Sequence, residues 1–421
     1  MSVRRTRIKL DINQLRPGVY IEMPVGWNDH PFMFSNFIIA SNKQVAQLRK
    51  ANIRFVWGIP AKSTSTPLPL DEVKDSAELV VENDDQLNQE INEMAAEKLK
   101  KIEQMQSYRR QIKKCEASYQ TSISKVRSLT SKMQSRPLQA MTEAHEVIAT
   151  MTDTLLAKDN IVLHLVNDDR DDVDVYQHAV TVSMLAMMIA KQLNVEKQQI
   201  TEIGIAGLLH DIGKLKIPSQ FYTGTDISPS KRRFVIEKHP SYSVDFLNLS
   251  PDISDGIKKM VLEHHEFADG SGYPDGKTIS QLHPFSLVLS LVNYYEMLCH
   301  PHDESKPKSQ SQSISHIFKH RKHLFDPKQL NAFVKSMGIY PPGTLVKLSN
   351  GHIGIVITVD SKRLLFPNVL IYDESIPRNE AAIIDTEKEG ISVSGAVVVN
   401  TLPRKVVEYL NPQTRASFYF D

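Results

Sequence analysis

The sequence predicts a mainly α-helical protein, with a small α/β module at one end and a β-rich tail at the other. Two observations predict this. Apolar residues recur at helical spacing through most of the stretch from residue 95 to 337, and short β-branched runs replace them after Gly338. At roughly 150 residues per domain, the length of 421 residues predicts two or three domains and a sizeable core. We expect boundaries near residues 70, 145 and 337.

Residues 1–70 are predicted to form the small α/β module. Short β-like runs at residues 8–10, 19–21 and 37–39 alternate with glycine and proline turns, and a helical stretch covers residues 41–50. A proline-rich connector and an acidic patch follow, which places the end of the module between residues 65 and 85.

A long amphipathic helix is predicted within residues 71–145. Its apolar positions make eleven steps over 38 residues, or about 3.5 residues per step, as in a coiled coil. Pro137 ends the pattern. The stripe fits either a helix packed on the domain that follows or the seam of a homodimer, and the sequence leaves both open. Its residues are Ala95, Leu99, Ile102, Met105, Tyr108, Ile112, Cys115, Tyr119, Ile123, Val126, Leu129 and Met133.

Residues 146–337 are predicted to form a helical domain with histidine-rich junctions, and residues 338–421 a β-rich tail. The runs of the tail are separated by Asn-Gly, Asp-Ser and Glu-Gly turns. The tail and the N-terminal module contain no metal-binding or nucleophile constellation in their sequences, so we expect both to serve packing and regulation.

Composition excludes several classes of protein. The hydrophobic share of 41% and the charged share of 24% are those of an ordinary soluble protein. The net charge of +1 does not indicate an extended basic surface for binding duplex nucleic acid or an anionic membrane, although a local basic pocket could bind a small phosphate ligand. Two cysteines exclude a disulfide framework, and the longest apolar stretch, residues 180–190, is too short to span a bilayer. The first residues lack the apolar core of a signal peptide, so we expect a cytoplasmic protein.

The chemistry is concentrated in residues 146–337. His178 begins an amphipathic helix, and Asp174 lies four residues earlier on the same face. The adjacent pair His210 and Asp211 ends another apolar helix and runs into Gly213. One metal ion can bind an imidazole and a carboxylate placed in this way, and a carboxylate with two oxygens can bridge two cations.

More histidines follow at His239 and at the pair His264 and His265, just before a glycine-rich loop at residues 269–276. Two consecutive histidines are uncommon in a structural helix, because adjacent side chains point about 100° apart. The set suits at least two cations. Nitrogen and oxygen ligands without a CxxC motif favour iron or manganese over a structural zinc.

These motifs, in this order, resemble those of the HD-GYP subgroup of the HD superfamily of metal-dependent phosphohydrolases. The resemblance covers residues 150–337. The N-terminal module resembles the domain of unknown function often found before HD-GYP domains, and residues 340–348 resemble a tail that often follows them. The motifs are His210-Asp211, His239-Pro240, His264-His265-Glu266 and Gly272-Tyr273-Pro274, with Leu15-Arg16-Pro17-Gly18-Val19-Tyr20 and His30-Pro31-Phe32 in the N-terminal module.

The resemblance implies an HD-type helical bundle that hydrolyses cyclic di-GMP, a bacterial second messenger, to pGpG or GMP with metal-activated water. Cyclic GMP-AMP is a second substrate to consider. The implied metal ligands are His178, His210, Asp211, His239, His264 and His265, with Asp211 bridging two ions. Lys214 would meet a substrate phosphate, or else is a solvated lysine at a helix end. Asp174 would hold a third ion, or else is an ordinary exposed carboxylate. The loop Gly272-Tyr273-Pro274 would serve substrate access and contacts with a signalling partner, or else is a simple tight turn.

The sequence departs from the family pattern in two places. Asn293 stands where the family usually has an aspartate ligand, and a neutral amide should weaken metal binding. Glu296, one helical turn later, could supply the missing carboxylate. An arginine-rich stretch is replaced by residues 300–306, which removes a phosphate-binding patch. The alternative function is therefore a degenerate domain that binds a cyclic dinucleotide or a protein partner without turnover.

Overall fold

The computed structural model describes residues 7–26, 29–32, 34–69, 84–157, 162–166, 175–223, 227–301, 306–360, 362–374, 376, 378, 381–411 and 415–417. These residues fall into two compact units. The first contains residues 1–109 with residues 373–381, and the second contains residues 110–372 with residues 382–421. The architecture confirms the predicted mainly α fold with a small N-terminal sheet and a C-terminal sheet.

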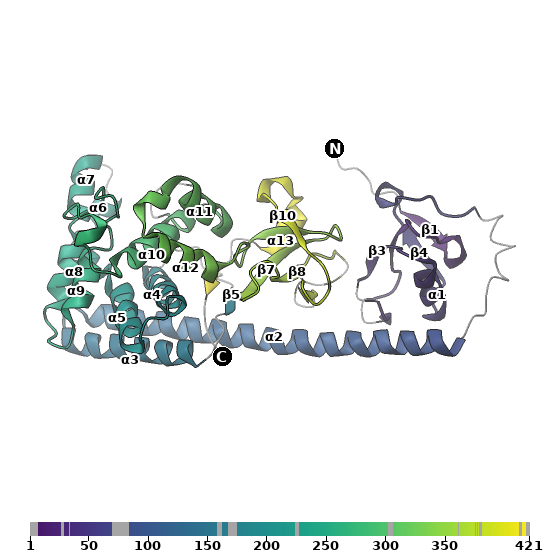
Figure 1. Cartoon of the computed structure of the whole chain (residues 1–421), viewed down its shortest axis with the longest axis horizontal. Helices are drawn as coiled ribbons and strands as arrows, with labels where there is room; N and C mark the ends of the chain where they lie inside the picture. The colour runs from purple at the N-terminus through teal and green to yellow at the C-terminus, as the bar shows by residue number, and fades with distance from the viewer. Residues whose placement is uncertain are drawn as a thin grey trace. The chain divides into compact units, whose positions relative to one another are not determined.

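The first unit contains an antiparallel four-stranded sheet in the order β1-β4-β2-β3, with helix α1 (Asn42–Lys50) packed against it (Figure 1). The strands are β1 (Ile8–Asp11), β2 (Tyr20–Glu22), β3 (Asn36–Ile38) and β4 (Phe55–Gly58). Ser41 begins the helix, because its side chain accepts a hydrogen bond from the amide of Gln44. The short 3-10 turns η1 (Ile12–Gln14) and η3 (Pro60–Lys62) complete this module.

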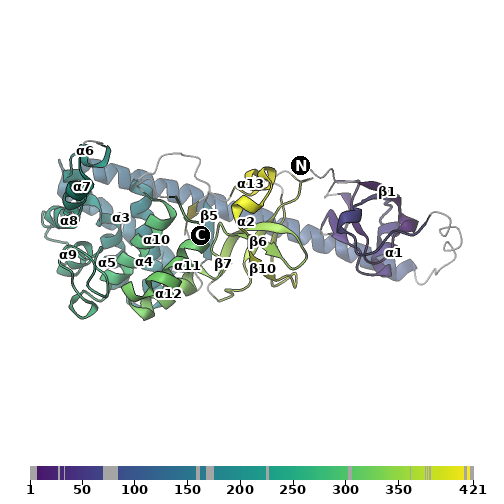
Figure 2. The ribbon, with the colours of Figure 1, turned by 90° about the horizontal axis from the view of Figure 1, so that it is seen from above.

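The second unit contains a helical bundle and a sheet, and most strands of the sheet follow the bundle in the sequence (Figures 1 and 2). Helix α4 packs mainly on α5 and also on α10 and α12, while α5 packs on α3 and α9. The helices are α3 (Pro137–Leu156), α4 (Val175–Gln192), α5 (Lys197–Leu209), α6 (Gln220–Thr223), α7 (Pro229–Ile236), α8 (His239–Leu247), α9 (Asp255–Leu262), α10 (Ser286–Cys299), α11 (Gln310–His316) and α12 (Pro327–Met337). Shorter turns are η6 (Ile212–Lys216), η7 (Ile279–Gln281), η8 (Ile317–Arg321) and η9 (Lys322–Leu324).

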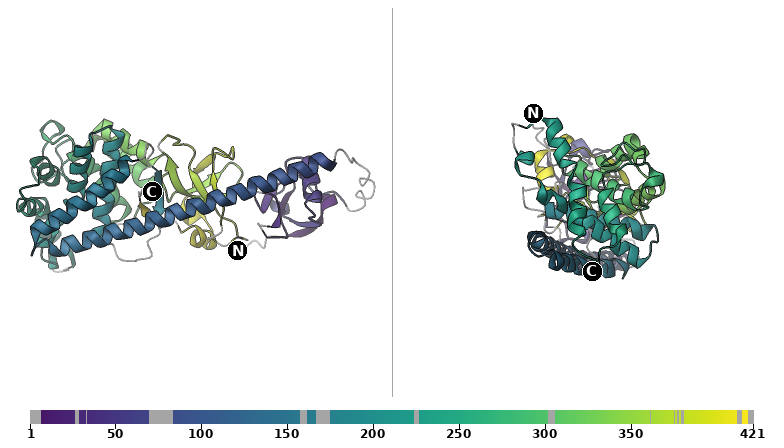
Figure 3. Two further views of the ribbon diagram at one scale, coloured as in Figure 1. Left: turned by 90° about the horizontal axis from the view of Figure 1, so that it is seen from below. Right: turned by 90° about the vertical axis from the view of Figure 1, so that its left-hand side faces the viewer.

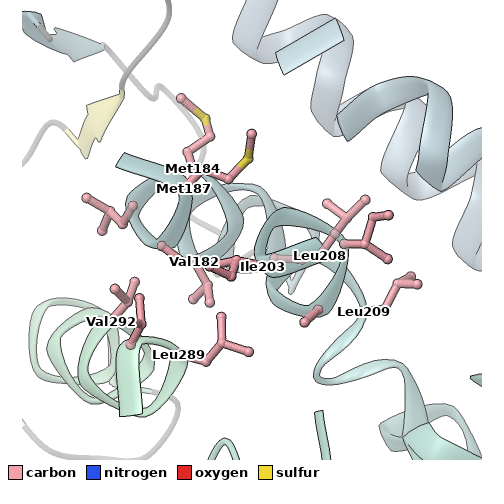
Figure 4. Close-up of a cluster of buried hydrophobic side chains, with 14 of the residues drawn as sticks. Val182, Met184, Met187, Ile203, Leu208, Leu209, Leu289 and Val292 are labelled. Carbon is pink, nitrogen blue, oxygen red and sulfur yellow. The ribbon is translucent and has the colours of Figure 1, made fainter. Parts of the chain in front are cut away.

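The core of the bundle lies where α4, α5 and α10 meet. Figure 4 shows Val182 of α4, Ile203 of α5 and Leu289 of α10 directed toward one another, and all three are fully buried. Helix α4 is buried almost all round over its middle turns, as expected of a central helix. This tightly packed centre fixes the ends of the helices, and it is these ends that present the histidines.

The long helix α2 (Asp84–Lys132) is present, and Pro137 begins the next helix after a short turn. From Cys115 to Met133 the apolar stripe is buried, and from Tyr119 onward it belongs to the core of the bundle. The C-terminal part of α2 and α3 lie side by side (Figure 3), and Lys132 pairs with Glu143 at 2.6 Å. Leu99, by contrast, is 62% exposed. The side chains of Met105, Tyr108 and Ile112 lie outside those described.

The tail supplies six strands of an antiparallel seven-stranded sheet, and β5 (Val162–Val166) supplies the seventh. The order is β10-β6-β7-β5-β11, and β8 pairs with β7 and β9. The strands of the tail are β6 (Leu345–Leu348), β7 (Ile353–Asp360), β8 (Asn368–Ile371), β9 (Ile383–Asp385), β10 (Val393–Ala396) and β11 (Arg415–Ser417), with η11 (Val399–Thr401) and helix α13 (Arg404–Leu410).

Strand β5 (Val162–Val166) differs from the expectation that residues 146–337 are helical throughout. It pairs with β7, with Leu163 opposite Val359. Its apolar run is too short for a helix of average length, and a partner strand nearly 200 residues later satisfies its backbone groups. In the described part of the chain, no helix combines the length and the apolar character needed to cross a membrane.

Candidate metal centre

Five histidines and one aspartate from separate helix ends meet in one place. His178 lies in the first turn of α4, His210 and Asp211 follow the last residue of α5, and His239 is the first residue of α8. His264 and His265 follow α9. The side chains thus come from elements that the buried core holds rigidly, as a site of defined geometry requires.

The candidate ligands form two groups that share Asp211. One contains Asp211, His239, His264 and His265, and the other contains His178, His210 and Asp211, with the ligand atoms of each group within 4.8 Å of one another. Oδ1 of Asp211 lies 3.1 Å from Nε2 of His239, and Oδ2 lies 3.3 Å from Nε2 of His210. Each carboxylate oxygen therefore faces a different group, which is the arrangement of a bridging ligand.

Contacts at the far side of the rings fix the histidine tautomers. Nδ1 of His210 lies 2.8 Å from the carbonyl oxygen of Gly207, Nδ1 of His239 lies 2.7 Å from that of Ile236, and Nδ1 of His264 lies 2.6 Å from that of Val261. A carbonyl oxygen only accepts, so we assign the proton to Nδ1 in each ring. The Nε2 lone pairs then point inward.

These lone pairs face one another at short distances. Nε2 of His178 lies 3.2 Å from Nε2 of His210, and Nε2 of His239 lies 3.1 Å from Nε2 of His264. Nδ1 of His178 lies 2.8 Å from a carboxylate oxygen of Glu296, which accepts, so we assign the proton of this ring to Nδ1 as well. No proton then lies between the facing nitrogens. Two buried acceptors at this distance repel unless a cation lies near both, so the residues fit divalent metal ions.

The electrostatics of the site also fit metal binding. Burial, reinforced by the neighbouring histidines, holds the pKa values of His264 and His265 well below their usual range. Burial alone would raise the pKa of Asp211, but the charged and polar groups around the carboxyl, with the Lys214 ammonium among them, outweigh it and hold this pKa well below the ordinary value. Neutral imidazoles around an ionised carboxylate are the protonation states that a metal ion requires.

Lys214 lies beside the shared carboxylate. Its Nζ is 2.6 Å from Oδ2 of Asp211, and its side chain is half-buried. Gly213 allows the turn between them to pack closely on α8, since a Cβ there would overlap the carbonyl oxygen of His239 and the amide of Ser243. Ser243 joins the two segments, accepting from the amide of Gly213 at 2.8 Å and donating to the carbonyl of His210 at 2.7 Å. Ser243 was not predicted from the sequence. Its position one helical turn after His239 is the one signal that could have suggested it.

The loop at residues 269–276 folds back over the group that contains His239, His264 and His265. The ring of Tyr273 stacks on that of His265, with centroids 4.4 Å apart and planes 17° apart. Glu266, fully buried, holds the loop by accepting hydrogen bonds from the amides of Asp275 at 2.7 Å, Gly276 at 3.0 Å and Lys277 at 3.1 Å. Gly272 packs so closely on the backbone of residues 265–267 that a Cβ there would overlap it. Tyr273 therefore lies directly against a candidate ligand.

Helix α10 brings Asn293 and Glu296 to the bundle interior, where both are buried. Glu296 does not join either group of candidate ligands among the described residues. Its Oε2 lies 2.8 Å from Nδ1 of His178, on the side of the ring away from the facing lone pairs. Burial would raise the pKa of Glu296, but His178 and His300 together hold it well below its ordinary value. Asp174 lies outside the described residues.

A histidine-aspartate pair joined by histidines from three further elements around one shared carboxylate is the arrangement expected of a metal-dependent phosphohydrolase of the HD type. Residues 162–329 match the HD domain family, and residues 7–144 match a domain of unknown function, DUF3391. The match over residues 162–329 confirms the predicted resemblance to HD-type phosphohydrolases of the HD-GYP subgroup.

Curated proteins and a solved structure are similar to the chain. The cyclic di-GMP phosphodiesterase PA4108 of Pseudomonas aeruginosa is 27% identical over 368 residues, which are 86% of this chain and 84% of that protein. The 3'3'-cGAMP-specific phosphodiesterase 1 of Vibrio cholerae is 25% identical over 148 residues, which are 35% of this chain and 33% of that protein. The structure of Bd1817 from Bdellovibrio bacteriovorus matches with a TM-score of 0.43 and 12% identity, covering 78% of this chain and 98% of that one.

Proposed function

We propose that this protein hydrolyses cyclic di-GMP to pGpG or GMP. The observation that carries the proposal is the Asp211 carboxylate, whose two oxygens face two groups of inward-pointing imidazole lone pairs, with the Lys214 ammonium 2.6 Å from Oδ2. Two bound ions would supply an activated water and neutralise the charge that develops on phosphorus.

The candidate ligands and Lys214 have different roles in the proposed reaction. His178 and His210 would hold one ion, and His239, His264 and His265 would hold the other, with Asp211 shared between the two groups. Iron or manganese suits this set, because it contains nitrogen and oxygen donors and no thiolate. A third ion at Asp174 is part of the proposal. Lys214 offers a compact positive charge to a phosphate of the substrate, and it is the residue besides the ligands that we assign to catalysis, together with Asp211.

Cyclic di-GMP is the first choice of substrate, because the relative that matches most of this chain is named for it. Cyclic GMP-AMP is the second, since a relative that matches a shorter part is named for that dinucleotide. Both substrates carry two phosphodiester groups and differ in one base. We assign contacts with the substrate or a signalling partner to the Gly272-Tyr273-Pro274 loop, and the stacking of Tyr273 on His265 supports this assignment.

Asn293 favours a second candidate, a degenerate domain that binds a cyclic dinucleotide without turnover. A product assay on wild type and Asn293→Asp, with both dinucleotides and in both iron and manganese, separates the two. If the site is catalytic, wild type yields linear dinucleotide or GMP, and Asn293→Asp raises the yield by supplying a charge. Absence of product from both proteins, with ligand still bound, would leave the binding module.

Metal content is the direct check on the centre. We expect at least one iron or manganese ion per chain after anaerobic purification with added metal. His264→Ala and Asp211→Ala should each strip metal, because removing a ligand leaves an ion under-coordinated. His145→Ala, which changes a histidine of α3 outside both groups, is the control. Less than one ion per chain in wild type would count against the enzyme.

We further propose a cytoplasmic location and a homodimer through the part of α2 that contains Leu99. The exposed Leu99 continues a stripe whose later residues are buried in the bundle. Light scattering should give twice the mass of one chain for wild type and a lower mass for Leu99→Glu. Equal masses for the two proteins would contradict this dimer.

A further inference from the structure

The hydroxyl of Ser243 contacts both ends of the turn at residues 210–213, which carries the shared carboxylate. It donates to the carbonyl oxygen of His210 at 2.7 Å and accepts from the amide of Gly213 at 2.8 Å. The carbonyl of His210 belongs to the peptide bond between the two candidate ligands His210 and Asp211, and Gly213 directly precedes Lys214. One side chain therefore restrains the backbone that positions three residues of the candidate site.

The two contacts satisfy backbone groups that the neighbouring helices leave without a partner. Helix α5 ends at Leu209 and η6 begins at Ile212, so the chain changes direction at the ligand pair. The last carbonyl groups of one helix and the first amide groups of the next have no partners within their own helices. Only a group that both donates and accepts can serve the two at once, as a hydroxyl does. Ser243 is fully buried, so its loss would leave both groups unpaired inside the protein.

The position of Ser243 on α8 links the turn to the other group of candidate ligands. His239 is the first residue of α8, and Ser243 lies four residues later on the same face. The turn packs closely on this part of α8, because a Cβ at Gly213 would overlap the backbone of His239 and Ser243. Oδ1 of Asp211 lies 3.1 Å from Nε2 of His239. The contacts of Ser243 thus fix the turn against the helix whose first residue faces the shared carboxylate.

We propose that Ser243 is a positioning residue that holds Asp211 between the two groups of candidate ligands before a metal ion binds. The inference rests on the metal centre of the proposed function. Ser243 belongs to neither group among the described residues, and it acts through the backbone of the turn. Its loss should weaken both ions together, because Asp211 is shared. Loss of His178, which belongs to one group, should weaken mainly one ion.

A manganese titration of the metal-free, full-length chain tests the inference without any need for catalysis. The free ion is followed by its electron paramagnetic resonance signal. We expect Ser243→Ala to weaken both classes of manganese sites by about 10- to 100-fold, the range found when a residue that orients metal ligands is lost. His178→Ala should weaken one class much more than the other.

Ser183→Ala is the matched control. Ser183 is also fully buried, and its hydroxyl donates to the carbonyl of Gly204 in a neighbouring helix at 2.8 Å. Both variants lose one buried hydroxyl, so a general loss of stability would affect manganese binding in the two proteins alike. Ser183→Ala should bind manganese as wild type does. Equal losses in the two variants, a loss in Ser243→Ala that is confined to one class, or binding by Ser243→Ala as tight as wild type would overturn the inference.

Hydrogen exchange of the metal-free wild type keeps the test decisive if Ser243→Ala does not fold, as judged by circular dichroism. The amide of Gly213 should already be protected from exchange without manganese, because it donates to Ser243. An amide that exchanges freely until manganese is added would show that the ion holds the turn, which would overturn the inference. Wild type that binds no manganese would overturn both proposals. Wild type that binds manganese but never cleaves a cyclic dinucleotide would contradict the proposed function alone.

Discussion

Nε2 of His239 lies 3.1 Å from Nε2 of His264, although the contacts of both rings place their protons on Nδ1. The two lone pairs meet in a buried site where water cannot separate them. Such a pair costs folding free energy in the metal-free protein, and a cation that contacts both nitrogens removes that cost. The same geometry that binds metal therefore makes the bundle depend on metal for stability.

Metal should consequently raise the melting temperature. At a free manganese concentration 100 times the dissociation constant, binding at one site stabilises the folded state by about 2.7 kcal/mol. For a domain of this size that corresponds to an increase of roughly 5–10 °C. Differential scanning calorimetry with and without a chelator measures it.

The matched control is Asp211→Asn, which keeps the side-chain shape and removes the charge that faces both groups. Its melting temperature should respond much less to manganese. If manganese and iron both leave the wild-type melting temperature unchanged, the lone-pair argument is wrong.

Lys214 should matter for turnover and little for metal binding. Its ammonium, 2.6 Å from Oδ2 of Asp211, is not a metal donor when protonated, but it can meet a phosphate oxygen. We expect Lys214→Met to lower kcat/KM for cyclic di-GMP by about 10²- to 10³-fold, the range found when one charge-stabilising donor is lost. Lys214→Arg should restore little, because a planar guanidinium does not replace a compact ammonium.

Metal content measured beside the kinetics separates this role from a structural one. Lys216→Met is the control, because Lys216 pairs with Asp245 on the surface and should retain full activity. Equal activity of Lys214→Met and wild type would show that Lys214 is merely a solvated lysine at a helix end.

Glu266 should stabilise the loop that carries Tyr273. Its buried carboxylate accepts from three backbone amides, at residues 275, 276 and 277. Glu266→Gln replaces one accepting oxygen by a donor, so at least one amide of the loop loses its charged partner. We expect a loss of about 1–3 kcal/mol in the free energy of unfolding, measured in urea. Glu408→Gln, at an exposed position of α13, loses only a surface pair with Arg404 and should change this free energy by less than about 0.5 kcal/mol.

Much of the fold could be predicted from local sequence patterns, because they report local structure. The strands and the helix of the N-terminal module, and the shift to strands after Gly338, follow from periodicity and turn residues. Strand β5 did not follow, since its pairing with β7 is decided by a partner nearly 200 residues away. The short run Phe55–Gly58, which pairs with both β1 and β2, was missed for the same reason.

The candidate ligands could be found from the sequence because their motifs are short and distinctive. The contacts that the imidazole rings make on the side away from the centre could not be predicted. Glu296 was considered as a ligand, and only the packing of α10 on α4 reveals that it lies behind His178. Ser243 contacts both His210 and Gly213, although it lies 33 and 30 residues after them in the sequence. No local sequence pattern predicts such a contact.

The apolar stripe of α2 gives the last prediction, because its two halves have different surroundings. Leu129 is 1% exposed in the core of the bundle, whereas Leu99 is 62% exposed. Leu129→Ala should therefore cost about 2–5 kcal/mol of unfolding free energy, from lost burial and the cavity left behind. Leu99→Ala should change the free energy of unfolding of the bundle by less than about 0.5 kcal/mol. Urea denaturation at two protein concentrations measures both. The loss in Leu129→Ala should be the same at both concentrations, because Leu129 packs within its own chain. A loss that grows on dilution would show instead that this half of the stripe is the dimer seam.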